Sequence, residues 1–136
     1  MSITNLQVLT HAYQKAGIIS EGGTPSAEQG QVALRLLNQM MAEWEIDGLE
    51  FPSWFPQTAN SDTCPIPEFA ELAVSNKLAV LLCTEYGVAA SAELGVMARM
   101  SYDAVLRKRA NQRLRPVDLN IADAEGGYYY RDITAG

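Results

Sequence analysis

The chain has 136 residues, of which 48% are hydrophobic, and a formal net charge of −6. This length suits one domain with a single core, and this apolar content argues against an intrinsically disordered protein. No apolar run approaches the length of a membrane span (about 18 residues), and the first residues lack the pattern of a secretory signal, so we expect no membrane contact.

The first half of the chain predicts two helices joined by a short turn. Apolar residues three and four apart indicate a helix over about residues 4–16, with Thr4 as its N-cap. The pair Thr24-Pro25 supplies an N-cap and a first-turn proline, so a second helix is expected over about residues 25–47. The residues predicted to face the core are Leu6, Leu9, Tyr13 and Ala16, then Val32, Ala33, Leu36, Leu37, Met40 and Trp44.

The second half predicts two more helices, over about residues 68–86 and 91–112, separated at Gly87. Short loops within each pair make the helices antiparallel neighbours. The predicted fold class is therefore all-α, a small four-helix bundle. We expect a helical domain over residues 1–115 and an extended tail over residues 116–136. The core residues predicted here include Phe69, Leu72, Ala73, Leu78, Ala79, Leu82, Tyr86, Leu94, Met97, Ala98, Tyr102, Val105 and Leu106.

A connection over residues 48–67 is much longer than bundle loops usually are. It carries Phe51, Trp54 and Phe55 among prolines, which prevent a continuing helix. Exposed aromatic side chains of this size either fold back on the bundle or meet a partner. We favour partner contact for this aromatic loop, with self-packing as the alternative.

The tail alternates apolar and other residues at Val117, Leu119 and Ile121, which is the period of a strand. Three consecutive tyrosines follow Gly126-Gly127, and tyrosine is enriched at interface hot spots. We therefore predict an extended arm that orders on assembly, with a frayed terminus as the alternative. The three tyrosines are Tyr128, Tyr129 and Tyr130.

Charge is segregated along the sequence. Half of the ten basic residues lie within nine positions, and the rest of the chain is strongly acidic. This basic run could meet an acidic face on another copy, bind nucleic acid, or complement a helix C-terminus, and all three interpretations stay open. The basic run is Arg107, Lys108, Arg109, Arg113 and Arg115, and the acidic group near the end of the second helix is Glu43, Glu45, Asp47 and Glu50.

Signals for catalysis are weak. His11 is the sole histidine, and Cys64 and Cys83 have no metal-ligand spacing, so we expect reduced cysteines and no cofactor or metal. Glu43, Asp47 and Glu50 could supply the two carboxylates of a cell-wall hydrolase, but residues four apart on a helix meet that distance trivially. We expect the chain not to be an enzyme.

The segment Met40-Met41-Ala42-Glu43-Trp44, followed by Asp47-Gly48, resembles the tail accessory factors of short-tailed bacteriophages. The similarity extends more loosely over about residues 4–115. It implies a virion structural protein made in the host cytoplasm, a head-to-tail adaptor that forms a ring, twelve-fold in that family, beneath the portal. Its implied partners are other copies of the chain, the portal protein, the tail nozzle or other tail proteins, and packaged DNA that the ring helps to retain.

Two other functions remain as alternatives. One is a nucleic-acid-binding helical module that uses residues 107–115, which the net negative charge disfavours. The other is the small hydrolase that uses the acidic group.

Overall fold

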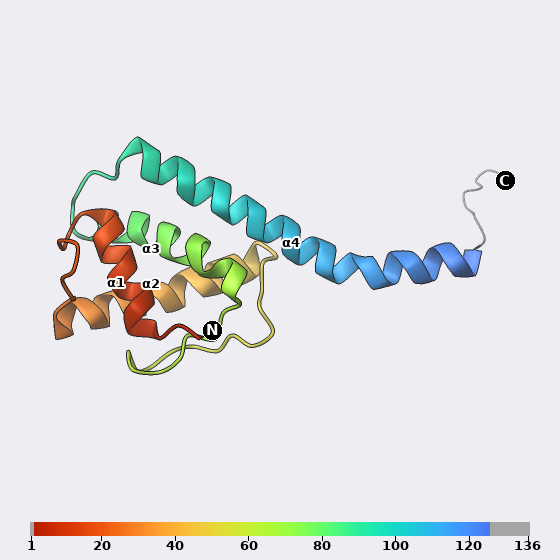
Figure 1. Cartoon of the computed structure of the whole chain (residues 1–136), viewed down its shortest axis with the longest axis horizontal. Coiled ribbons are helices and arrows are strands. Elements are labelled where there is room, and N and C mark those ends of the chain that lie inside the picture. The colour runs from red at the N-terminus through yellow and green to blue at the C-terminus, as the bar shows by residue number, and fades with distance from the viewer. Residues whose placement is uncertain (1, 126–136) are drawn as a thin grey trace. The chain divides into compact units, whose positions relative to one another are not determined.

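Four α-helices and one 3-10 turn make up the regular structure of residues 2–125 (Figure 1). The structure, a computed structural model, describes residues 2–125, and the side chains of residues 2–112. No strand occurs in this part, so the all-α prediction is confirmed. The elements are α1 (Asn5–Ala16), α2 (Ala27–Ile46), η1 (Glu68–Ala70), α3 (Glu71–Glu85) and α4 (Ala92–Glu125).

The chain divides into two units, residues 1–105 and residues 106–136, and the division falls within α4. The predicted boundary at residue 115 stays a prediction.

Both early helices begin with reciprocal capping. Thr4 accepts a hydrogen bond from the Gln7 N–H while the Gln7 side chain accepts one from the Thr4 N–H, so Thr4 is confirmed as an N-cap. Ser26 and Gln29 make the same pair of bonds at the start of α2. The prediction that α2 begins at Thr24-Pro25 was wrong: Gln29, three residues after Ser26, completes a capping box, whereas Ala27, three residues after Thr24, has no side-chain acceptor for one.

The core of the first unit forms where α3 packs against α1 and α2. Predicted core residues such as Leu9, Tyr13, Leu37 and Leu78 are fully buried. Leu6, Leu72 and Tyr86, however, are exposed, contrary to the prediction. In α1 the buried stripe runs through Asn5, Val8, Leu9, Ala12, Tyr13 and Ala16, so Leu6 lies beside the stripe rather than on it.

The long loop is fastened to the start of α1. Its backbone pairs with the residues before and at the helix start: the Asn5 N–H donates to the Asp62 carbonyl at 2.9 Å, and the Cys64 N–H donates to the Ile3 carbonyl at 2.8 Å. Figure 1 shows the loop passing the N-terminal end of α1. Because these backbone hydrogen bonds hold it, the long loop packs against α1 as part of the folded domain.

Buried amides hold the middle of the same loop. The Asn5 side chain, fully buried, donates to Gln57 Oε1 at 2.9 Å and to the Ala59 carbonyl at 2.8 Å. The Asn38 side chain on α2 both donates to the Gln57 carbonyl and accepts from its N–H. These contacts join α1, α2 and the loop through hydrogen bonds between side chains and backbone inside the domain.

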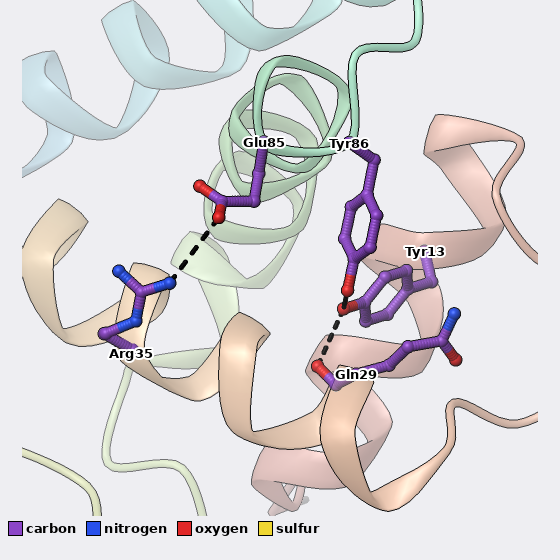
Figure 2. Close-up of polar contacts among 5 residues, drawn as sticks. All are labelled: Tyr13, Gln29, Arg35, Glu85 and Tyr86. Carbon is purple, nitrogen blue, oxygen red and sulfur yellow. Dashed lines mark hydrogen bonds and ion pairs between the residues drawn. The ribbon is translucent and has the colours of Figure 1, made fainter.

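A tyrosine pair closes the other end of the bundle (Figure 2). The Tyr13 hydroxyl donates to the Gln29 carbonyl at 2.7 Å and lies 2.9 Å from the Tyr86 hydroxyl. Because the single Tyr13 hydroxyl proton is directed to Gln29, Tyr86 is the donor within the pair. Arg35 on α2 forms an ion pair with Glu85 at 3.6 Å in the same region. These contacts tie the end of α3 to α1 and α2.

Replacing Tyr13 with phenylalanine is expected to lower the free energy of unfolding by about 1–2 kcal/mol at pH 7. Burial, and then the bond with Tyr86, raises the pKa of Tyr13 above its ordinary value. The unfolded chain therefore ionises this tyrosine first, so its contribution is complete below about pH 10 and is lost as the pH rises further. Urea unfolding at pH 7 and pH 10.5 should show a smaller alkaline loss for Tyr13→Phe than for the wild type.

Tyr86→Phe is the matched control, because it keeps the bond between Tyr13 and Gln29. An alkaline loss of the same size in wild type and Tyr13→Phe would contradict this account.

The end of α4 corrects the tail prediction. The helix continues through Pro116 to Glu125, so the extended strand predicted at Val117, Leu119 and Ile121 is wrong. Leu114, Val117 and Ile121 are also three and four apart, so the same residues fit a helix period equally well. No glycine interrupts residues 96–125, and α4 ends just before Gly126.

Candidate interaction surfaces

The three aromatic residues of the loop have different environments. Phe51 is 5% exposed and packs edge-on against Phe69, with ring centroids 6.4 Å apart. Trp54 is half-buried, and Phe55 is 60% exposed. The self-packing alternative therefore holds for Phe51, whose ring belongs to the core, while Phe55 leaves most of its ring at the surface.

A small hollow lies where α2 passes into the loop. Its volume is about 120 Å³, and both apolar and polar surface from the two segments line it. Exposed Glu45 and Glu50, members of the acidic group, also line it. The full lining is Met41, Glu45, Leu49, Glu50, Phe51, Pro52 and Trp54.

A larger cleft of about 570 Å³ lies between the end of α2, α3 and the first turns of α4. Trp44 lines it and is 2% exposed, which confirms its predicted burial. Its ring meets that of Tyr102 edge-on at 5.1 Å, and Lys77 and Val80 of α3 line the same cleft. This aromatic pair joins α2 to α4.

Charged side chains surround that aromatic pair. Glu43 and Asp47 line the cleft with Asp103 of α4, and two basic residues, Lys77 and Arg99, line it as well. Burial raises the pKa of Tyr102, and Asp47, Asp103 and Glu43 raise it further. The sequence singled out Glu43 and Asp47. It gave no sign of Asp103, because the face that α4 turns toward α2 depends on tertiary packing.

The basic run lies on α4. Arg107 and Lys108 are exposed, while Arg109 is half-buried and donates to Gln112 at 3.0 Å. Arg113 and Arg115 lie on the same helix, but their side chains, like those of Val117, Leu119 and Ile121, fall outside the part described in side-chain detail. Tyr128, Tyr129 and Tyr130 lie outside the described residues.

One apolar surface was missed by the sequence prediction. Val96, Met97 and Met100 on α4 are 56%, 44% and 64% exposed, although Met97 was predicted to face the core. Leu94, Ala98 and Val105 take the buried positions instead. Consecutive residues lie about 100° apart around a helix axis, so with Ala98 facing the core Met97 falls on the exposed side.

The described residues carry little that points to other chemistry. No group of three or more His, Cys, Asp or Glu residues there could hold a metal ion, and no described helix is long and apolar enough to cross a membrane. Cys64 and Cys83 are both free, as predicted, and buried. Burial raises the pKa of the Cys64 thiol to about 12, which keeps it unreactive at neutral pH. The hydrolase alternative would have to draw its carboxylates from the large cleft.

The features described above lie at the surface of a small helical domain. They suit a protein that acts by binding other macromolecules. Residues 1–126 match the model of the P22 tail accessory factor family, and the chain belongs to that family. It is therefore a structural component of a phage tail and is associated with the virion. A search of curated proteins found no match.

Proposed function

We propose that this tail accessory factor is a head-to-tail adaptor, several copies of which form a ring beneath the portal. In this role the ring continues the DNA channel, joins the head to the tail and helps to retain packaged DNA. Family membership supports a role in the tail. The ring arrangement rests mainly on one observation, the segregation of charge between the end of α2 and the basic run on α4.

That segregation favours contact between unlike surfaces of two copies. Residues 43–50 carry four acidic residues and no basic one, and the described carboxylates there are exposed. Residues 107–115 carry five basic residues and no acidic one. A surface that attracts a different surface of an identical chain gives a head-to-tail contact, which closes into a ring when the rotation between copies allows it.

Packaged DNA is a second partner for the basic run. Exposed Arg107 and Lys108 can contact phosphates without reading sequence, as suits DNA that slides through a channel. The net charge of −6 is unfavourable for a free-standing DNA-binding protein. We therefore place DNA contact in the assembled ring, where the basic segments of several copies act together.

Mixing the chain with the portal protein of its phage, and measuring the mass of the product by native mass spectrometry, tests the adaptor role. We expect a complex that holds several copies of this chain on each portal ring. Deleting residues 116–136 removes the last turns of α4 and the tyrosine cluster, and should leave a folded monomer that fails to attach.

The control for folding is the circular dichroism of the truncated chain, which should keep the helical signal of residues 5–105. A truncated chain that attaches to the portal as well as the full chain would contradict the role given to this segment. A full-length chain that does not bind the portal would contradict the adaptor role itself.

A further inference from the structure

The outward face of α4 is apolar and lacks a partner within the described chain. Val96, Met97 and Met100 occupy neighbouring positions on it and are 44–64% exposed, with Met100 the most exposed of the three. The opposite face is already used, because Leu94, Ala98 and Val105 are buried. Unbranched methionines adapt to irregular surfaces, which suits a helix face that packs against another chain.

The hollow at the end of α2 is a place where one side chain of such a face could insert. At about 120 Å³ it has room for one unbranched apolar side chain, and Met41, Leu49 and Trp54 line it. Further apolar surface lies nearby in the chain, since Ile46 and Phe55 are 85% and 60% exposed. A hollow lined by both apolar and acidic side chains, with more apolar surface near it, resembles an interface site at which one anchoring side chain contributes most of the affinity.

Charge identifies the occupant of this hollow. Glu45 and Glu50 line it, within the acidic stretch of residues 43–50. The α4 stretch of residues 96–109 is net basic, with Arg99, Arg107, Lys108 and Arg109 against Asp103. An apolar segment beside an excess of basic residues is therefore what the hollow would attract, and this chain carries such a segment itself.

We propose that α4 of one copy docks on the neighbouring copy, with Met100 inserted into the hollow at the end of that copy's α2. The contact rests on the proposed ring and supplies its heterologous interface. Because the two surfaces differ, each copy uses its α4 toward one neighbour and its hollow toward the other. The charged residues orient the contact, and the apolar insertion provides most of its affinity.

Cysteine cross-linking in purified virions tests the contact directly. Virions carrying Met100→Cys together with Glu45→Cys should form disulfide-linked dimers and higher multimers on mild oxidation, because the proposal brings these two positions together across the interface. The native cysteines are buried and should not compete. The matched control pairs Val88→Cys with Glu45→Cys, since Val88 is also exposed but follows the C-terminal end of α3 and takes no part in the proposed contact.

A second readout uses charge in place of the apolar side chain. Met100→Glu should reduce the copies of this chain per virion by about tenfold, whereas Val88→Glu should leave incorporation near the wild-type level. Both variants alter exposed residues, and circular dichroism of the free proteins checks that they fold.

The outcomes separate this contact from the ring. Virions that hold several copies per portal, but show no Met100–Glu45 cross-link and normal incorporation of Met100→Glu, would overturn the docking proposal and leave the ring intact. Virions that hold a single copy would overturn both. A ladder of multimers confined to the Met100–Glu45 pair would support the contact.

Discussion

Replacing Trp44 with alanine is expected to lower the free energy of unfolding by about 3–5 kcal/mol, as for other truncations of large buried aromatic residues. Trp44 is fully buried at the end of α2, and its ring meets Tyr102 of α4 edge-on. Its loss would leave a void beside a cleft that already admits water. Such a loss is a large share of the roughly 5–15 kcal/mol that stabilises a domain. Urea unfolding monitored by circular dichroism measures it.

Trp54→Ala is the matched control, because Trp54 is half-buried in the loop and lines the small hollow. It should cost less than about 1.5 kcal/mol of stability but weaken assembly. Equal losses for the two tryptophans, or a loss below about 1 kcal/mol for Trp44→Ala, would contradict the core described for α2.

Asn5→Ala should have the second largest effect, a loss of about 2–4 kcal/mol. The side chain amide of Asn5 supplies two buried hydrogen bonds, to Gln57 and to Ala59, and each acceptor left without its donor costs about 1–3 kcal/mol. The second polar atom of the Asn5 side chain, Oδ1, makes no hydrogen bond, so its removal does not lower the free energy of unfolding further. The loop should loosen with the domain, and amide exchange at Cys64, whose N–H bonds Ile3, should accelerate.

Gln39→Ala, at an exposed position of α2, is the control and should change stability by less than about 0.5 kcal/mol. If Asn5→Ala unfolds at the wild-type urea concentration and leaves exchange at Cys64 unchanged, the buried amides do not hold the loop.

The helices could be predicted because their signals are local. Thr4 caps the start of α1 as predicted, and Gly17, in the left-handed conformation at φ 77°, follows its last residue, close to the predicted end at residue 16. The errors arose where two local signals competed. At the start of α2 both Thr24-Pro25 and Ser26 fit a cap, and at Val117 to Ile121 both a strand and a helix period fit. A window of five residues cannot separate those periods.

The surfaces were harder to predict because burial depends on contacts between distant segments. The loop aromatics were recognised as a group, yet only packing against Phe69 distinguishes Phe51 from Phe55. Likewise, nothing local marks Asp103 as a neighbour of the acidic end of α2, or Met97 and Met100 as exposed. Asn5 and Asn38 hold the long loop, but in the sequence each is only an asparagine within a predicted helix, so this role could not be predicted.

Cryo-electron microscopy of intact virions tests the central claim most directly. The account predicts several copies of this chain in a closed cyclic ring immediately below the portal, each contacting one neighbour through α4 and the other through the end of α2. A single copy, a two-fold dimer, or density for this chain elsewhere in the tail would contradict it.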